Sequence, residues 1–310
     1  NISTFFKNKQ GLFLVGGFVA SNDKGVFTTL GRGGSDYTAS LLGAGINAEV
    51  IEIWTDTDGV LTADPSKVSG TFSLDKISYL EAGELSYFGA KVIYSKTMKP
   101  AQEKSIPVVI KNTFNSQTKG TIICDDKIKH DFPISGVTSL SSMSLLTIES
   151  KQDKNIGKIV ARILNLLSQS AIEILLITHA SHKQTFSILI NSNQAQKAKD
   201  IIEKDFLLEI KARQMLPITI TNNLSIVTIV GEQMKGTVGI SEKIFGSLGK
   251  DRINVVAISQ GSSELSISVV IDSKDEIRAL QAIHKTFFDS DSQSINLFLV
   301  GTGVVGSTLL

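Results

Sequence analysis

Two stretches of the chain, 145–190 and 226–271, repeat one pattern of apolar residues at a displacement of 81 positions. Each copy reads as strand, loop, amphipathic helix, strand, turn and strand, and a further helical pattern follows each copy. The repeat predicts two βαββαβ units of ferredoxin-like type, each burying one sheet face under its helices. Such pairs gain stability by pairing edges and often sense small ligands; two packed units that bind nothing are the alternative. The displacement superimposes these core positions: Ile148 on Ile229, Ile159 on Ile240, Ile163 on Ile244, Leu167 on Leu248 and Ile172 on Ile253.

The part of the chain before the repeat alternates strand and helix patterns. Apolar runs within 11–20, 49–65 and 106–112 read as strands, and 78–93 reads as a helix. This alternation predicts a three-layer α/β domain. The charged and polar stretch 125–133 is the candidate linker between that domain and the repeat.

The composition excludes several classes of function. A net charge of +1 over 310 residues gives no basic footprint for a nucleic acid. No apolar run approaches the length of a membrane span, and the single cysteine, Cys124, rules out an internal disulfide and fits a reducing cytosol. We therefore expect a cytoplasmic protein without nucleic-acid or membrane partners. The chain begins with Asn1 and stops inside a glycine motif, so we expect an internal piece of a longer protein.

The stretch "GRGGSDYTASLLGAG", residues 31–45, has the composition of an anion-binding turn. Its glycines let the backbone approach a ligand, and the helix that follows offers unpaired N–H groups at its first turn. Arg32 adds a planar cation suited to a carboxylate or phosphate. We expect Ser35 or Asp36 to cap the helix and Gly43 with Gly45 to end it. A tight strand-to-helix turn with a solvated arginine is the alternative interpretation.

Three motifs together, "GRGGSDYTASLL", "EIWTDTDGVLTADP" and "ELSYFGAKVI", resemble in order and spacing the distal half of an aspartate kinase catalytic domain. The doubled βαββαβ units resemble the tandem ACT regulatory modules of that family. The terminal "INLFLVGTGVVGSTLL" resembles the first strand and phosphate loop of a homoserine dehydrogenase. This order resembles the bifunctional aspartate kinase–homoserine dehydrogenases. It implies a kinase part over 1–128, ACT units over 129–289 and a truncated NAD(P)-binding start over 290–310.

The resemblance implies an aspartate-binding site in the first motif. Arg32 would pair with a substrate carboxylate, Gly34 and Ser35 would contribute the helix N-terminus, and Asp36 would face the substrate ammonium or steady the loop. A plain helix cap remains the alternative for Asp36, and a surface role the alternative for Arg32.

The resemblance also implies a site for ATP with Mg²⁺ along Thr55, Asp56, Leu61 and Lys91. Thr55 and Asp56 follow a strand, where ligands bind in open α/β sheets, and Lys91 is a compact cation suited to phosphates. Leu61 stands where many relatives have a tyrosine, and Ser66 where they have an arginine. The family's N-terminal "KFGG" strand is absent from this sequence. We therefore expect this chain alone to carry half of the kinase site and to be inactive as a kinase.

For the ACT units, the resemblance implies an amino-acid effector, threonine in bifunctional members, and a homodimer or higher homo-oligomer. The family's effector glutamine is present as Gln260, and the displacement of 81 places His179 at the matching position of the first unit. Asn254 and Ser262 are candidate neighbours of the effector, although each could simply cap or line a turn. A histidine that only satisfies an interface is the alternative for His179.

The last glycines, Gly301, Gly303 and Gly306, would bring a helix N-terminus to a dinucleotide pyrophosphate. Four residues follow them, so we expect no hydride transfer from this chain. Two other interpretations stay open: a fragment that only binds amino acids through its ACT pair, and a monofunctional aspartate kinase with a chance glycine tail.

Overall fold

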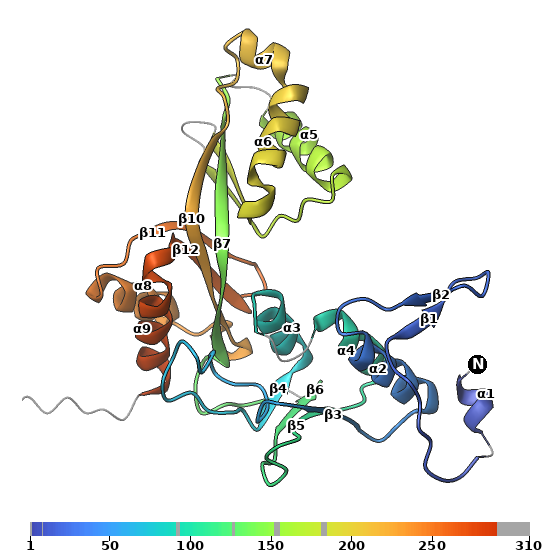
Figure 1. Ribbon diagram of the computed structural model, residues 1–310. Coiled ribbons are helices and arrows are strands. Elements are labelled where there is room, and N and C mark those ends of the chain that lie inside the picture. The colour runs from blue at the N-terminus through green and yellow to red at the C-terminus, as the bar shows by residue number, and fades with distance from the viewer. Residues whose placement is uncertain are drawn as a thin grey trace, which may run out of the picture.

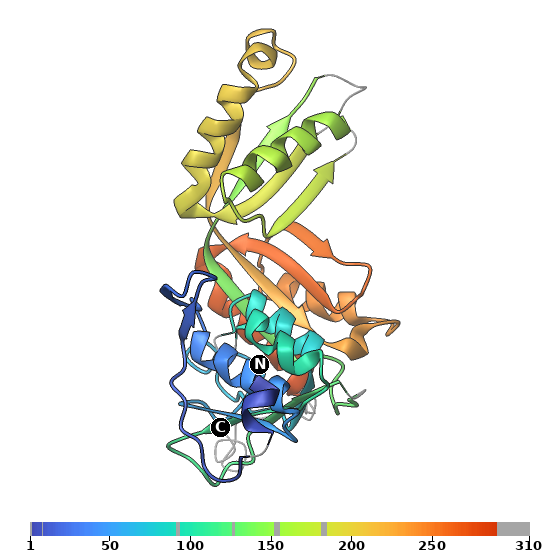
Figure 2. The same cartoon turned by 90° about the vertical axis from the view of Figure 1, so that its right-hand side faces the viewer.

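The structure, a computed structural model, describes residues 2–7, 9–90, 94–125, 128–151, 156–180 and 185–289. An N-terminal α/β region lies beside two α/β units that share one sheet (Figures 1 and 2). The predicted α/β class is confirmed. No helix in these ranges combines the length and apolar character needed to cross a membrane.

The N-terminal region is built on a four-stranded sheet of order β3-β5-β6-β4. β3 pairs parallel with β5 and β4 parallel with β6, whereas β5 and β6 are antiparallel. A small hairpin and a short helix precede the sheet. The elements are α1 (Ile2–Phe6), β1 (Val19–Ser21), β2 (Phe27–Thr29), α2 (Gly34–Ile46), β3 (Ile51–Thr55), β4 (Lys76–Ser78), α3 (Tyr79–Tyr87), α4 (Ser95–Gln102), β5 (Val108–Asn112) and β6 (Thr121–Cys124).

The strand predicted within 11–20 is wrong for most of its length. Only Val19–Ser21 is a strand, and the preceding Leu12 and Leu14 are 101% exposed. An apolar run becomes a buried strand only where a neighbouring strand and a covering layer receive it. The described part of the chain supplies neither for this run.

The predicted ends of the helix α2 are also wrong. Gly33, in a left-handed conformation, is its N-cap and makes no side-chain cap bond, so neither Ser35 nor Asp36 caps it. The helix continues through the two glycines expected to end it and stops at a left-handed Asn47. Gly43 is retained inside the helix because a Cβ there would lie 2.6 Å from the Ile51 side chain of β3.

We expect Gly43→Ala to destabilise the chain by about 1–2 kcal/mol, because the overpacking against Ile51 exceeds the better helix propensity of alanine. Gly249→Ala is the matched control, since nothing lies within 4 Å of a Cβ at that helical position. The control should stabilise by up to about 1 kcal/mol. Urea denaturation of both variants measures the difference, and equal midpoints would contradict this packing argument.

The two ACT-like units form one six-stranded sheet of order β11-β12-β10-β7-β9-β8. Its central strands are long: the first half of β7 pairs with the second half of β10, and the second half of β7 pairs with β9. Figure 1 shows β7 and β10 side by side, running from one unit into the other. The strands are β7 (Gly136–Glu149), β8 (Leu176–Ala180), β9 (Thr185–Asn191), β10 (Thr219–Val230), β11 (Val255–Gln260) and β12 (Ser266–Asp272).

Unit 1 consists of residues 143–222, and unit 2 consists of residues 136–141 together with 224–289. Each unit therefore completes its four strands with half of a long strand. The first half of β10 is the fourth strand of unit 1, and the first half of β7 is the fourth strand of unit 2. Along the chain, unit 1 lies between the two parts of unit 2, which are the strand at 136–141 and the remainder at 224–289. The tandem repeat in the sequence does not reveal this insertion. The helices are α5 (Ile156–Gln169), α6 (Ser192–Asp205) and α7 (Leu207–Lys211) in unit 1, and α8 (Ile240–Lys250) and α9 (Glu276–Phe288) in unit 2, with 3₁₀ turns at Glu232–Met234 and Ser273–Asp275.

The structure confirms the repeat at the level of single contacts. Ser142 and Asn223, 81 positions apart, are both left-handed, and so are Ala171 and Arg252. The hydroxyls of Thr147 and Ser187 pair in unit 1, and their equivalents Thr228 and Ser268 pair in unit 2. The predicted core positions of both copies pack in the cores beneath the helices, including Ile148, Ile163, Leu167, Ile229, Ile244 and Leu248.

The N-terminal region and unit 2 exchange residues between their cores. Val230 of β10 packs in the core of the N-terminal region, whereas Ala63 and Val68 of the loop after β3 pack in the core of unit 2. The rings of Phe72, Phe132 and Phe288 close the same boundary. Apolar burial therefore joins the two parts.

Candidate functional site

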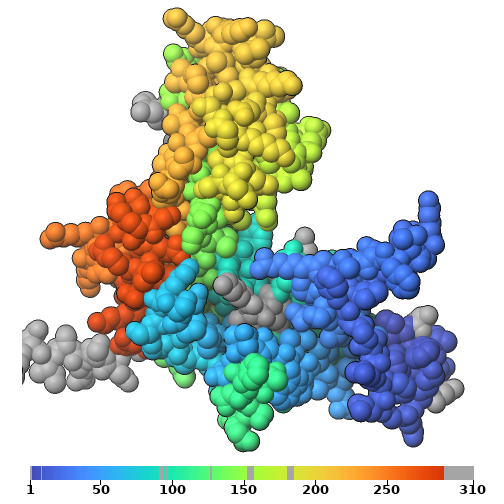
Figure 3. Space-filling model, in the orientation of Figure 1, coloured from blue at the N-terminus to red at the C-terminus, as the bar shows by residue number. Residues whose placement is uncertain are grey.

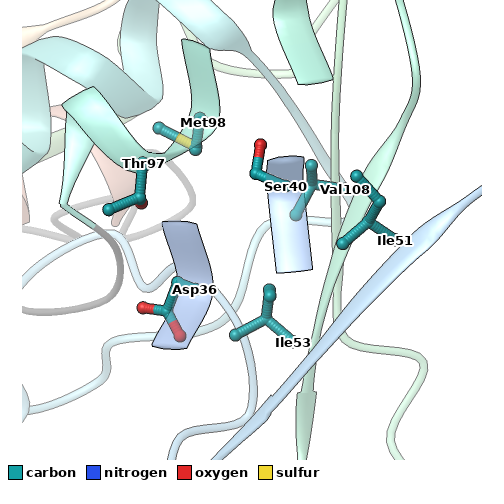
Figure 4. A pocket seen from close by; sticks show the side chains of 7 residues that line it. All are labelled: Asp36, Ser40, Ile51, Ile53, Thr97, Met98 and Val108. Carbon is teal, nitrogen blue, oxygen red and sulfur yellow. The ribbon is translucent and has the colours of Figure 1, made fainter. Parts of the chain in front are cut away.

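The candidate site lies beside the first turns of α2, over the first half of β3 and the start of β5. A helix N-terminus favours anions, and the carboxyl ends of β3 and β5, the usual ligand position in open α/β sheets, lie further along the same strands. Asp36 and Ser40 of α2 face Ile53 of β3 across a small hollow that is partly open to solvent (Figure 4). The remaining lining comes from Ile51, Thr97, Met98 and Val108. The hollow combines a carboxylate with largely apolar walls.

Asp36 is the titratable group of this hollow. Burial raises the pKa of its carboxyl above the ordinary value, and a weak contact from the Ser35 hydroxyl at 3.5 Å opposes that rise. A carboxylate in this setting is stabilised by any cation that enters the hollow. Asp36 is thereby suited to a ligand ammonium group.

The neighbouring residues of the first motif divide into packed and exposed positions. A Cβ at Gly33 would lie 3.0 Å from Thr97, and one at Gly34 would lie 2.6 Å from Phe18. These glycines therefore serve close packing of the turn. Arg32 and Ser35 are exposed at the same turn, where they are free to contact a ligand.

The acidic loop after β3 is held in place by Asp58, which is not among the predicted site residues. Asp58 accepts hydrogen bonds from the side-chain amides of Asn112 at 2.7 Å and Asn115 at 3.2 Å. Thr55, at the end of β3, is half-buried, and Asp56 beside it is exposed. The two asparagines were missed because their link to Asp58 spans 54 and 57 positions of chain.

The remaining predicted nucleotide residues have mixed outcomes. Leu61 is half-buried and bridges to Ser73 of the returning chain. Ser66 is exposed and donates its hydroxyl to Asp64 at 2.6 Å in a tight turn. Lys91 lies outside the described residues, as do Gly301, Gly303 and Gly306.

The predicted effector residues occupy matching places in the two units. His179 pairs with Phe186 across β8 and β9, and Gln260 pairs with Ile267 across β11 and β12. Both side chains are exposed, and so are Asn254 and Ser262. The structure thus leaves these groups open to a ligand or to a second chain.

Glu81 is a buried carboxylate at the boundary with unit 2. Its side chain is 1% exposed and accepts hydrogen bonds from the amides of Ser78 and Glu232 and from the Ser135 hydroxyl, with His130 at 3.6 Å. Burial alone would raise its pKa, but the His130 ring and these donors outweigh burial and lower the pKa to about 2. The Ser78–Glu81 capping box has a recognisable sequence signature, whereas the contacts with unit 2 have none.

Glu276 is a second buried carboxylate at this boundary, supplied by α9. It binds Lys67 of the N-terminal region at 2.6 Å and accepts from the hydroxyls of Ser139, Ser141 and Ser225. Burial alone would raise its pKa, but Lys67 and the serines lower the pKa to about 2. No sequence motif pointed to this cluster.

An α/β region with a glycine-rich turn before α2, joined to two ferredoxin-like units on one sheet, is the arrangement of an amino-acid kinase with ACT regulatory units. Residues 1–112 match the amino acid kinase family, and residues 227–287 match the ACT domain. Over its whole length the chain is a relative of the aspartate kinases, and it spans little more than a third of the bifunctional relatives that it matches. It is 41% identical over 310 residues to the bifunctional aspartokinase/homoserine dehydrogenase of Buchnera aphidicola, a match covering 100% of this chain and 38% of that protein.

Solved structures agree with this assignment. The aspartate kinase of Clostridium acetobutylicum superimposes with a TM-score of 0.78 at 34% identity, covering 87% of this chain and 62% of that one. Escherichia coli aspartokinase III in complex with aspartate and ADP (R-state) gives a TM-score of 0.73 at 29% identity, covering 87% of this chain and 59% of that one. Its complex with lysine and aspartate (T-state) gives 0.68 at 29% identity, covering 88% and 59%. The family and fold are thereby confirmed; the individual site residues and the domain limits stay predictions.

Proposed function

We propose that this chain carries the aspartate side and part of the nucleotide side of an aspartate kinase. In that reaction, a side-chain carboxylate oxygen of L-aspartate attacks the γ-phosphorus of ATP, ADP leaves, and 4-phospho-L-aspartate forms. The observation that carries the proposal is the hollow in which Asp36 of α2 faces the strand β3 that ends at Thr55. The similarity to a kinase solved with aspartate and ADP supports it.

Each residue of the first motif has a role that its position allows. The exposed Arg32 guanidinium would pair with a substrate carboxylate, and the half-buried Asp36 would hold the substrate ammonium. At the start of α2, Ser35 would contribute its N–H group, and Gly34, whose own N–H donates to the Gly31 carbonyl at 3.1 Å, would hold the turn that presents it. Together they would orient the carboxylate that receives the phosphoryl group, which is the main task in phosphoryl transfer.

On the nucleotide side, Thr55, Asp56, Leu61 and Lys91 would contact ATP. Magnesium, which neutralises phosphate charge when bound, commonly reaches such sites with the phosphates and one or two carboxylates. The exposed Asp56 carboxylate at the end of β3 fits that requirement. Asp58 is already held by two asparagine amides and would instead keep the loop in place.

We expect Asp36→Asn to weaken L-aspartate binding by about 10- to 100-fold, because a charge-assisted hydrogen bond to the substrate ammonium is lost. Calorimetric titration of the chain with L-aspartate measures this, and MgADP affinity should stay unchanged. Asp23→Asn, the same change in the exposed β1–β2 turn, is the control. A folded chain whose aspartate affinity is unaffected by Asp36→Asn would reject the assignment.

The ACT pair would bind an amino-acid effector, with threonine as the proposed ligand. Gln260, His179, Asn254 and Ser262 are exposed near the edge strands β8 and β11, which supports access for a small polar ligand. Titration with L-threonine, using L-lysine and L-methionine as controls, tests this choice. One site per chain would indicate that Gln260 alone serves, and two would indicate that His179 serves as well. Selective lysine binding would reject threonine.

Self-association through the ACT units is the proposed assembly, as a homodimer or larger homo-oligomer. The edge strands β8 and β11 expose equivalent isoleucines, Ile177 at 45% and Ile258 at 48%, which favours burial against another chain. Light scattering that gives a monomer at high concentration would reject it.

In the longer relatives a homoserine dehydrogenase accompanies the kinase, and Gly301, Gly303 and Gly306 are the proposed contacts for NAD(P).

A further inference from the structure

The loop after β3 connects the proposed nucleotide side with unit 2. It begins with Asp56, directly after Thr55 at the end of β3, and its later residues Ala63 and Val68 are buried in the core of unit 2. Figure 3 shows the light-blue surface of this part of the chain against the red surface of α9. The same loop therefore has one end at the site and the other in the regulatory region.

Successive residues of this loop have fixed hydrogen-bond partners. Asp58 is held by Asn112, and the Val60 amide donates to the Thr121 hydroxyl at 2.8 Å. The Thr62 carbonyl accepts from the amide of Val137 in β7 at 2.8 Å. A contiguous network of this kind is the physical route by which two sites become coupled.

One face of α9 receives the far end of the loop. Glu276 binds the Lys67 ammonium at 2.6 Å, and Gln281 donates to the Lys67 carbonyl at 3.0 Å. One turn further along the helix, His284 lies 2.9 Å from the Thr62 hydroxyl. Lys67 and Glu276 form an ion pair between the N-terminal region and unit 2, with side chains 26% and 7% exposed.

The internal repeat shows that the ACT fold does not itself require this carboxylate. The position equivalent to Glu276 in unit 1, 81 residues earlier, is Ala195, which is buried without a polar side chain. Ser144, the counterpart of Ser225, is paired there with Ser192 and Asn222 instead. The carboxylate thus occurs in the unit that contacts the loop and is replaced by alanine in the unit that does not.

We propose that Glu276 is a positioning residue for the nucleotide side of the site, acting through Lys67 to fix the loop between Thr55 and Lys67. The inference rests on the proposed function for the identity of the ligand, but the mechanical link is a property of the chain itself. Unit 2 then supports the nucleotide side of the site at all times, because its α9 holds the loop in place. Loss of the ion pair loosens the loop while the hollow around Asp36, lined by α2, α4, β3 and β5, keeps its shape.

Hydrogen exchange on the 310-residue chain tests the link without any ligand. We expect Glu276→Gln to accelerate hydrogen exchange in peptides covering 56–66 by about tenfold. The interaction energy between two contacting residues corresponds to a fold-change of about this size in the opening equilibrium. Exchange in β5 and β6 should not change. Glu203→Gln is the matched control, because Glu203 accepts the Ile218 amide at 2.8 Å wholly within unit 1. Unchanged exchange in 56–66 would overturn the proposal.

A second variant separates the link from general damage. Lys67→Met should reproduce the acceleration, and combining it with Glu276→Gln should add nothing, because both remove the same contact. Additive accelerations would overturn the proposal. In parallel, MgADP affinity should fall about tenfold in both single variants, with L-aspartate affinity unchanged. If the unsubstituted chain binds no MgADP, the proposed nucleotide site fails, and the exchange data alone decide whether Glu276 fixes the loop.

Discussion

Replacing Glu81 with alanine should lower the free energy of unfolding by about 3–5 kcal/mol, the range for removing one partner from a buried charged cluster. The change leaves the Ser135 hydroxyl and the Glu232 amide without their acceptor at a closed boundary. It also breaks the capping box at the start of α3. Urea denaturation, with the midpoint and slope fitted together, measures the loss.

The control for this prediction is Glu103→Ala. The Glu103 side chain is 66% exposed and faces Lys99 at 3.9 Å, so its loss should cost under about 0.5 kcal/mol. Glu81→Gln, which retains one oxygen acceptor, should fall between the two. Equal losses for Glu81→Ala and Glu103→Ala would show that the buried carboxylate does not join the two regions.

Acid should weaken the chain through the same boundary. Glu81 and Glu276 each have a pKa of about 2 in the folded chain, against an ordinary glutamate value of 4.5. A carboxylate whose pKa is lower in the folded chain than in the unfolded chain stabilises the fold fully when the pH is above its unfolded pKa. This stabilisation is lost as the pH falls from 4.5 through about 2. The difference corresponds to about 3 kcal/mol at most for each group.

Urea denaturation at about pH 7, 5 and 3 measures this dependence, with the unfolding free energy falling mainly between the last two. Glu81→Gln and Glu276→Gln cannot titrate, so each should be less stable at neutral pH and should flatten the acid decline. Glu103→Gln should retain the full decline. A double Glu81→Gln, Glu276→Gln variant that still declines as steeply would place the acid-sensitive groups elsewhere.

Local signals in the sequence were sufficient to predict a segment's structure wherever its neighbours along the chain decide that structure. The apolar run within 49–65 predicted the strand that is β3, and the repeat predicted the helices and cores of both ACT units. The glycine turn before α2 located the start of the hollow. The capping pattern at Ser78 and Glu81 is likewise local.

Other features depended on residues distant in the chain. The carboxyl-terminal end of α2 was mispredicted because Gly43 accommodates Ile51 of the next strand rather than ending the helix. The role of Asp58 was missed because its partners, Asn112 and Asn115, come from the neighbouring strand β5 and the loop after it, 54 and 57 positions further along the chain. The run at 11–20 reads as a strand, yet burial requires a partner that local hydrophobicity cannot supply.

The sequence by itself determined the family, the α/β class, the doubled ACT pattern and the position of the turn carrying Arg32 and Asp36. These follow from local periodicity and from motifs whose residues are close together in the chain. The tertiary structure decided that the ACT units exchange their fourth strands and that Lys67 and Glu276 meet across the boundary. These contacts join residues separated by as many as 209 positions, and their stability arises from burial and pairing in the folded chain, which no local pattern encodes.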